Sequence, residues 1–570
     1  MGQLFAIIIK EAIRRKFYPV RNNGSIYIKA RKTLNSKLKA SNEKYHEISN
    51  GGKSVEGFEM LKKEICSRFG TTTPRNADIR DFYEKLIKAK KIKRSPAFEK
   101  ILKSKKVRTL SGVAVVAVLT KSYPCRGKCL YCPTEFEMPK SYLSNEPAVM
   151  RAISVKFDPY KQVQKRLRAL EINGHEIDKI ELIIMGGTFS DLPKSYQYWF
   201  VKECYRAAND YNKTRARQRR VRPWRKLQKQ LLYEQKRSES AKHRIIGLTL
   251  ETRPDTLNEE EIRFYRELGC TRVEIGVQSI YDDVLKKNQR GHAVEQTIKA
   301  TKLLKDAGFK VSYHMMPGLL GSSLKKDLEM FRELFRNPDF QPDLVKIYPC
   351  VVTKNSELYN LWKRKKYKAL TNKQAEKLIA EIKKIIPPYV RISRLVRDIP
   401  TTSIVAGPNV SNLRQIIQNK GIKCNCIRCR EVRGNYSAKD KIVLRRIDYD
   451  ASSGKEIYLE YVSPDHRKLY SLLRLRIPLH NHPSLFQKSE GQAIIREVHT
   501  YGKLVSLGKR EKKSPQHIGL GKKLIKEAER IAKNEFDCPK ISVIAGVGVR
   551  DYYRKLGYKL KETYMIKTLS

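Results

Sequence analysis

Short apolar segments alternate with helix-like stretches between residues 111 and 400. The apolar segments are Val113–Leu119, Lys179–Met185, Ile245–Leu250, Arg272–Gly276, Lys310–His314 and Leu344–Ile347. Between them lie amphipathic stretches such as Asp158–Glu171, Glu259–Leu268 and Val294–Ala307. Strands separated by spacers of helix length favour parallel pairing. We therefore expect an α/β fold here, with a partial or full β/α barrel of the TIM-like kind.

The chain has 570 residues, more than one hydrophobic core usually organises. We expect a basic helical region at 1–110, the barrel at 111–400, a linker with its own cysteines at 401–440, and a second α/β domain at 441–570. In the last domain, strand-like runs surround one strong helix, Gly519–Asn534. These runs are Ile457–Val462, Ser471–Arg476, Ala493–His499 and Ile541–Ala545.

The charge balance points to a polyanionic partner. The chain carries 118 Lys and Arg against 59 Asp and Glu, a formal net charge of +59. Residues 1–110 hold +18 of it, with helix-like apolar spacing in Asp81–Lys106, and residues 211–244 hold +11. The second segment interleaves basic and aromatic residues, as nucleic-acid-binding surfaces do: Arg219, Arg220, Arg222, Trp224, Arg225 and Lys226. Solvated helical surfaces, or a host proteome that is basic throughout, are the alternatives.

No stretch reaches the roughly 20 apolar residues of a membrane span, and Met1–Lys10 lacks the features of a secretory leader. We expect a cytoplasmic protein with no membrane partner. Of the 11 cysteines, six form two tight groups, which in such a chain favours metal or cluster binding over disulfides.

The first cysteine group, Cys125, Cys129 and Cys132, has the spacing C-x3-C-x2-C and follows the first expected strand. Three thiolates on one loop can hold three irons of a 4Fe–4S cluster and leave the fourth iron open for S-adenosylmethionine (SAM). Gly186, Gly187 and Thr188, at the end of the second strand, support this interpretation, because glycines there let a backbone approach a ligand. A structural zinc site is the alternative, although zinc usually takes a fourth protein ligand.

A glycine loop opens the helix near the C-terminus. Gln516, Gly519 and Gly521 form the pattern Q-x-x-G-x-G, and backbone N–H groups at such a helix start can bind a pyrophosphate. The pattern resembles the acetyl-CoA loop of the GNAT acetyltransferases. Downstream, Tyr552 and Tyr553 stand where that family places a tyrosine near the thioester sulfur, and a phenol can protonate a leaving thiolate. Core packing is the alternative for either tyrosine.

Together these motifs resemble the catalytic subunit of Elongator, in its stand-alone prokaryotic form, from about residue 65 to the end. The supporting segments are MGGTF at 185–189, ETRPD at 251–255, RVEIGVQS at 272–279, RGH at 290–292, HMMPG at 314–318, KIYPC at 346–350, RDIP at 397–400 and REVHTYG at 496–502. The resemblance implies a radical SAM barrel followed by a GNAT-type domain.

The resemblance also implies the chemistry. A carbon radical derived from acetyl-CoA adds to carbon 5 of the wobble uridine, position 34 of tRNA, and thioester hydrolysis leaves 5-carboxymethyluridine. Lys179 matches a lysine implicated in holding acetyl-CoA at the radical domain. The matching acetyl-CoA positions of the GNAT domain are Glu497, Val498, His499, Thr500, Leu520, Gly521, Lys522 and Tyr553. One departure is that Thr134 and Glu135 follow Pro133, where the family usually has two glycines.

The second cysteine group, Cys424, Cys426 and Cys429, suits a structural zinc, and the resemblance implies one there. A reduced group without metal is the alternative, and the sequence does not assign a fourth ligand. For the whole chain, the competing functions are a protein lysine acetyltransferase that uses only the GNAT domain, and a tRNA-binding scaffold. Both leave the first cysteine group without a role. The sequence is compatible with a homo-oligomer and does not assign accessory subunits.

Overall fold

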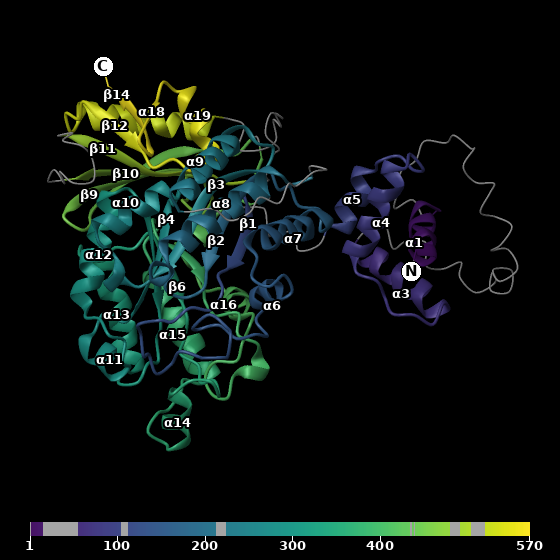
Figure 1. The fold of residues 1–570 in the computed structure, drawn as a ribbon, viewed down its shortest axis with the longest axis horizontal. Helices are drawn as coiled ribbons and strands as arrows, with labels where there is room; N and C mark the ends of the chain where they lie inside the picture. Colours follow the sequence, from purple (N-terminus) through teal and green to yellow (C-terminus); the bar gives the residue numbers. More distant parts are fainter. Residues whose placement is uncertain are drawn as a thin grey trace, which may run out of the picture. The chain divides into compact units, whose positions relative to one another are not determined.

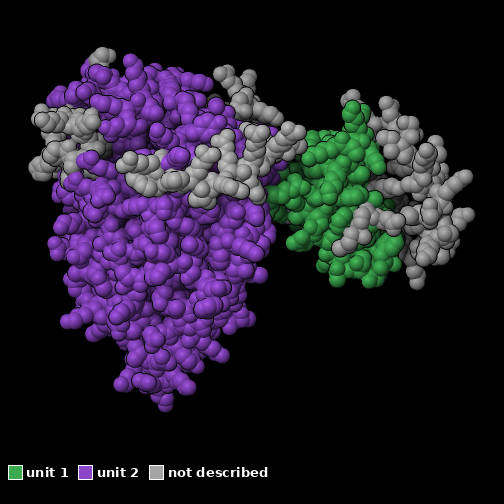
Figure 2. Space-filling view, viewed as in Figure 1, with its two compact units in different colours: residues 1–108, 167–177 green, residues 109–166, 178–570 purple. Residues whose placement is uncertain are grey.

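The computed structural model describes residues 2–14, 55–103, 112–212, 224–433, 436–437, 439–478, 491–502 and 519–569. Backbone contacts divide the chain into two compact units (Figure 2). Unit 1 comprises residues 1–108 and 167–177, and unit 2 comprises residues 109–166 and 178–570. No helix in the described ranges is both long and apolar enough to cross a membrane.

Unit 1 is helical, with α1 (Gly2–Arg14), α3 (Val55–Arg68), α4 (Asn76–Lys88) and α5 (Pro96–Leu102). The helix-like spacing of 81–106 is divided between two helices, because α4 ends at Lys88 and α5 starts afresh. Ser95 caps α5 by accepting a hydrogen bond from the Phe98 N–H, and Pro96 occupies its first turn, where a missing N–H costs nothing. Edge-to-face contacts of Phe98 with Phe58 and Tyr83 lie in the core of this unit.

The first sheet of unit 2 is parallel, with its seven strands in sequence order (Figure 1). The strands are β1 (Ala114–Leu119), β2 (Lys179–Met185), β3 (Arg244–Thr252), β4 (Arg272–Gln278), β5 (Lys310–Met315), β6 (Leu344–Ile347) and β7 (Arg391–Arg394). The expected partial barrel is confirmed, since β1 and β7 are the edges and do not pair. The sequence missed β7, a four-residue strand in which Ile392 alone is buried.

Helices connect these strands. They are α6 (Pro147–Ile153), α7 (Pro159–Ile172), α8 (Lys194–Asn209), α9 (Trp224–Ser240), α10 (Glu259–Glu267), α11 (Asp282–Lys287), α12 (Val294–Asp306), α13 (Leu324–Arg336), α14 (Leu358–Lys363) and α15 (Asn372–Ile385). Two short helices, α16 (Leu413–Asn419) and α17 (Ile427–Arg430), precede the second sheet. The basic segment 211–244 contributes α9, which packs on α8 through the buried Leu227 and Leu231.

The second sheet is mixed, in the order β13-β14-β12-β11-β10-β9-β8. Its strands are β8 (Val443–Asp450), β9 (Gly454–Val462), β10 (Leu469–Pro478), β11 (Gln492–Thr500), β12 (Lys540–Val543), β13 (Lys559–Lys561) and β14 (Tyr564–Thr568). Helices α18 (Leu520–Asn534) and α19 (Arg550–Arg554) complete it. β11 and β12 are its parallel pair, and they pair only over Gln492–Ile495.

The second sheet and the loops beside it contact the amino ends of barrel strands. Lys310, the first residue of β5, lies 3.2 Å from a carboxylate oxygen of Glu497 on β11. Near β3, a Cβ on Gly546 would stand 1.9 Å from the carbonyl oxygen of Ile246, so the backbones touch where only glycine fits. The second sheet is therefore fixed to the end of the barrel opposite the loops that follow its strands.

Candidate functional site

The three cysteines of the first group lie on the loop after β1, at the carboxyl end of the barrel. All three are free thiols. Cys125 accepts a hydrogen bond from the Gly127 N–H at 3.4 Å, and its sulfur lies 3.7 Å from the Thr188 hydroxyl. A Cβ on Gly127 would stand 2.3 Å from the Arg253 guanidinium and 3.5 Å from the Cys129 sulfur. The loop therefore curls tightly around the cysteine sulfurs.

Two buried arginines give this loop a positive surrounding. Arg290 donates to the Cys129 sulfur at 3.5 Å, and Arg253 donates to the carbonyl of Arg290 at 2.8 Å. Burial opposes ionisation of Cys129, yet Arg290 and Arg253 bring its pKa below the ordinary value. The pKa of Cys132 rises to about 11, because burial and the neighbouring Cys129 both disfavour its thiolate. A bound metal cation would ionise both Cys129 and Cys132, since the thiolate is the form of cysteine that ligates metal.

This donor set fits a 4Fe–4S cluster. The sulfurs of Cys125, Cys129 and Cys132 are not among the described groups that converge on a single ion, as expected when each thiolate binds a different iron of a cubane. The cationic arginines would offset the negative charge of such a centre. A pocket of about 710 Å³ adjoins the loop, lined by Arg126, Gly127 and Lys128 and by residues around Gly291.

The turn after β2 is the second component of this site. Gly186 has φ 138° and Gly187 has φ 92°, conformations that side-chain-bearing residues rarely adopt. A Cβ on Gly186 would also stand 2.0 Å from the Thr120 hydroxyl. That hydroxyl is buried without a hydrogen-bond partner in the described structure. The turn therefore lies beside the cysteine loop, since the Thr188 hydroxyl that follows Gly187 is 3.7 Å from the Cys125 sulfur.

Three of the predicted acetyl-CoA residues, Val498, Thr500 and Gly521, lie close together in the second sheet and at the start of α18. β11 pairs with β12 only as far as Ile495, and Val498 and Thr500 lie beyond that pairing. Helix α18 begins beside these two residues. A Cβ on Gly521 would lie 3.4 Å from the Thr500 hydroxyl, 3.7 Å from Val498 and 3.7 Å from the Tyr552 hydroxyl. Gln516 lies outside the described residues, as do Arg219, Arg220 and Arg222.

The two tyrosines differ in position. Tyr552 is 42 % exposed and its hydroxyl lies beside Gly521, whereas Tyr553 is 6 % exposed and packs in the core of the second sheet. Burial raises the pKa of both phenols, so each keeps its proton. Tyr552 is thus the better placed of the two to donate a proton to a ligand at the start of α18.

Lys179 and Glu497 lie at the junction of the two sheets. Lys179 is the first residue of β2, about 20 Å along the strand from Gly186 at the usual rise per residue. Burial lowers the pKa of its ammonium. The Glu497 carboxylate accepts hydrogen bonds from Arg474 at 3.0 Å and Lys310 at 3.2 Å. Because the side chain of Glu497 is engaged in ion pairs, a ligand at this point of β11 would contact the backbone of Glu497 and not its carboxylate.

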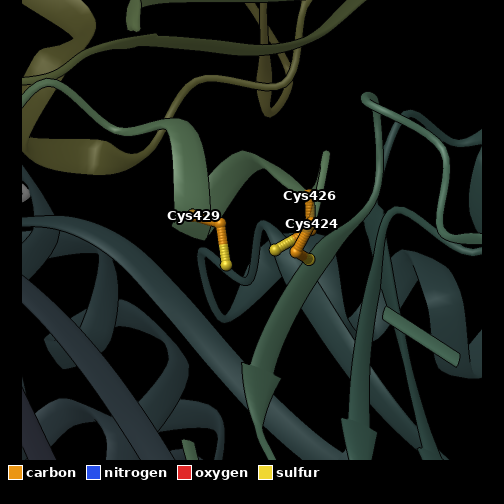
Figure 3. A group of neighbouring side chains, drawn as sticks. All are labelled: Cys424, Cys426 and Cys429. Atoms are coloured by element: carbon orange, nitrogen blue, oxygen red, sulfur yellow. The ribbon is translucent and has the colours of Figure 1, made fainter. Parts of the chain in front are cut away.

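The second cysteine group fits a single metal ion. The sulfurs of Cys424, Cys426 and Cys429 all lie within 4.8 Å of one another and point to a common centre (Figure 3). Two sulfurs bound to one zinc at about 2.3 Å each can be at most about 4.6 Å apart. The ammonium of Lys383 is fully buried near Cys429 and has no hydrogen-bond partner in the described structure. The positive charge of Lys383 would offset part of the negative charge of the three cysteine thiolates.

Sequence reasoning assigned no role to a set of charged side chains on the barrel strands: Glu251, Glu274, His314 and Lys346. Three of them open motifs quoted above. A signal in the sequence could have found them, because each of the strands β3 to β6 carries a charged or polar residue among apolar ones. Burying such a residue costs free energy unless it is paired, so its presence there indicates pairing or function.

The chain is similar to known proteins over most of its length. Residues 120–334 match the Radical SAM superfamily, and residues 342–422 match the Radical_SAM C-terminal domain. A tRNA uridine(34) acetyltransferase of Methanocaldococcus infernus is 46% identical over 534 residues, 90% of this chain and 95% of the relative. Human Elongator complex protein 3 is 38% identical over 92% of this chain and 95% of its own length.

A solved structure is also similar. It is the archaeal Methanocaldococcus infernus Elp3 with N-terminus deletion (1-46), which is 44% identical and superposes with a TM-score of 0.67. The match covers 80% of this chain and 99% of that one.

Proposed function

Because the chain belongs to the family of tRNA uridine(34) acetyltransferases and Elongator complex protein 3, we propose that it is a tRNA-modifying radical SAM enzyme. It uses acetyl-CoA to convert the wobble uridine of tRNA to 5-carboxymethyluridine. The observation that carries the proposal is the cysteine loop after β1 beside the Gly186–Gly187 turn, in a chain similar to these relatives over about nine tenths of its length.

The cofactors of this reaction have residues to hold them. Cys125, Cys129 and Cys132 bind three irons of the 4Fe–4S cluster, and backbone groups at Gly186 and Gly187 accept hydrogen bonds from the amino group of SAM. When bound, the cluster and SAM supply a 5′-deoxyadenosyl radical, which can take a hydrogen atom from the methyl group of acetyl-CoA. Arg253 and Arg290 offset the negative charge of the thiolates and exclude water from the inner side of the loop.

The second sheet acts as a GNAT-type acetyl-CoA site. The start of α18 provides N–H groups near Gly521 for the pyrophosphate, and the part of β11 beyond its pairing with β12, at Val498 and Thr500, binds the pantetheine. Tyr552 protonates the leaving CoA thiolate. Lys179, at the sheet junction, holds acetyl-CoA as it approaches the barrel. Cys424, Cys426 and Cys429 bind a structural zinc.

The substrate surface is basic. The formal charge of +59 favours a polyanion, and wobble bases lie in a loop from which they can be splayed into a pocket. The lysine-rich helices of unit 1 and segment 211–244 contribute phosphate contacts. We expect the enzyme to work in the cytoplasm, where tRNA is found.

Mass spectrometry of nucleosides tests this function. Protein reconstituted with iron and sulfide under anaerobic conditions is incubated with a reductant, SAM, acetyl-CoA and unmodified tRNA, and the tRNA is then digested. Carboxymethyluridine should appear only when all components are present, and C129S should abolish it. Wild-type protein with a full cluster that leaves every uridine unmodified would refute the proposal.

A further inference from the structure

Four polar side chains meet on one face of the barrel sheet. They are Glu251 on β3, Glu274 on β4, His314 on β5 and Lys346 on β6, and we refer to them as the strand quartet. Glu251 is the register partner of Glu274, and His314 is the register partner of Lys346. Since side chains alternate between the faces of a sheet, Val273 and Ile275 use the opposite face. Tyr142, from the segment after the cysteine loop, donates to Glu251 at 2.7 Å, so the quartet lies on the face that this loop covers.

The contacts within the quartet centre on Glu274. Its Oε2 lies 3.2 Å from Nε2 of His314, and the Lys346 ammonium contacts the same oxygen. Lys346 also donates to Glu251 at 3.4 Å. Burial opposes ionisation of Glu274, but Lys346 and His314 hold its pKa well below the ordinary value. Glu274 is therefore an anion, and an anion next to Nε2 fixes the proton of the imidazole on that nitrogen.

The imidazole of His314 is neutral, and one of its two ring nitrogens can still accept a proton. Burial and, after it, Lys346 lower the pKa of His314, while Glu274 and Glu251 oppose the change. With Nε2 donating to Glu274, Nδ1 keeps its lone pair, and it makes no hydrogen bond to any described residue. His314 retains 17 % side-chain exposure, more than the other three members of the quartet. The arrangement is that of a carboxylate-oriented base.

A metal ion is the other occupant that the distances allow, because ligand atoms of Glu251, Glu274 and His314 lie within 4.8 Å of one another. Lys346 argues against it. Its ammonium already bridges both carboxylates and supplies the positive charge that an ion would bring. With two carboxylates, one ammonium and a neutral imidazole, the quartet has a formal charge of −1. It becomes neutral when His314 takes up one proton.

The quartet lies close to the cysteine loop. The ring of Tyr348 stands edge-on to His314, with 5.6 Å between ring centroids. Tyr348 belongs to the same apolar cluster as Cys129 and Tyr131, and Cys132 packs against that cluster. His314 therefore borders the apolar cluster that contains residues of the proposed radical centre.

We propose that His314 is the general base that removes the proton from carbon 5 of the target uracil, and that Glu274 is the positioning residue that orients it. The inference rests on the proposed function, because replacing hydrogen by carbon at this atom requires the loss of a proton. In the step, the new C–C bond is already formed and the C5–H bond breaks. The proton goes to Nδ1 of His314 and the bonding electron pair stays in the ring, which then gives one electron to an acceptor of the iron–sulfur class.

The test follows the proton directly, with tRNA that carries tritium at carbon 5 of its uridines. Wild-type protein should release tritium to water together with carboxymethyluridine formation. H314Q should still make 5′-deoxyadenosine from SAM, but tritium release should fall by about 10²-fold or more, the usual contribution of a general base. The matched control is S312A, on the same strand and face, whose buried hydroxyl has no hydrogen-bond partner in the described structure. It should release tritium as the wild type does.

Imidazole NMR gives a second measurement that needs no cofactor. In wild-type apoprotein labelled with nitrogen-15, the His314 signals should be those of a neutral ring protonated at Nε2. E274Q removes the anion, so the pKa of His314 should fall and the tautomer mixture should change, while E274D should restore both. If H314Q releases tritium as fast as S312A, or if E274Q leaves the His314 tautomer unchanged, the assignment is wrong. Wild-type protein that releases no tritium and forms no carboxymethyluridine contradicts the proposed function itself.

Discussion

Arg496 of β11 lies 3.1 Å from Asp343, measured from Nη1 to Oδ1, and neither side chain is exposed to solvent. Asp343 immediately precedes β6, so this ion pair joins the second sheet to the amino end of the barrel. Arg496 also donates to Glu456 at 2.7 Å, and Arg476 pairs with the same glutamate at 3.1 Å. The two sheets of unit 2 thus share a buried network of charges in addition to apolar contacts.

Breaking this network should destabilise the protein strongly. R496M removes one of the two arginines that pair with the buried Asp343, leaving Arg474 at 3.4 Å, and it also removes the pair with Glu456. Loss of one member of a buried ion pair typically costs about 3–5 kcal/mol. Urea-induced unfolding followed by tryptophan fluorescence should show the loss as a lower midpoint. The matched control is R530M, which removes an exposed Arg530–Glu527 pair and should leave the midpoint nearly unchanged. Equal midpoints for R496M and R530M would show that the network does not couple the sheets.

Glu497 should make stability depend on pH. Burial opposes its ionisation, but Lys310 and Arg474 lower its pKa to about 2, against about 4.3 in an unfolded chain. Its contribution is therefore present above about pH 4.3 and is lost as the pH falls through about 2. E497Q should be less stable than the wild type at pH 6, and the difference should shrink as the pH is lowered to 3. A difference that stays constant over that range would contradict the assigned pKa.

Acetyl-CoA binding can be tested at the start of α18. G521D places an anion where the pyrophosphate should lie, so calorimetry should show a large loss of acetyl-CoA affinity with the iron content unchanged. The control K533D introduces the same residue, aspartate, in the last turn of α18, away from the start of the helix. It should bind acetyl-CoA normally. Unaltered affinity of G521D would refute the assignment of acetyl-CoA to the start of α18.

Phosphate contacts should appear in the salt dependence of tRNA binding. Each contact adds about 0.7–0.9 to the slope of log affinity against log salt concentration. Reversing Arg219, Arg220 and Arg222 to Glu should weaken tRNA binding and flatten its salt dependence. As a control, the exposed acid-paired Arg332 on α13 reversed to Glu should have a smaller effect. A triple variant with wild-type affinity and slope would favour a solvated surface over a tRNA contact.

Particular residues show what the sequence could predict. Strands such as β2 and β6 consist mostly of apolar residues, so the apolar pattern of the sequence located them. The cysteine spacing identified the loop after β1. The edge strand β8 was not predicted, because half of its residues are charged and none is buried. The strand quartet was not predicted, because its members are spread over 95 positions of the sequence, from Glu251 to Lys346. Only the pairing of the strands brings them together.

The second sheet shows the same limit. The glycine loop and the tyrosine pair were recognised as motifs, but the sequence could not say which tyrosine lies beside Gly521. That depends on the turn of α19, which directs Tyr552 outward and Tyr553 into the core.

Transfer of deuterium tests the central claim most directly. Reconstituted protein, SAM and tRNA are incubated with acetyl-CoA that is fully deuterated in its methyl group, and the 5′-deoxyadenosine formed is analysed by mass spectrometry. If the cysteine loop generates a radical that acts on acetyl-CoA, wild-type protein should yield 5′-deoxyadenosine carrying one deuterium, and C129S should yield none. Abundant 5′-deoxyadenosine without deuterium would contradict the account.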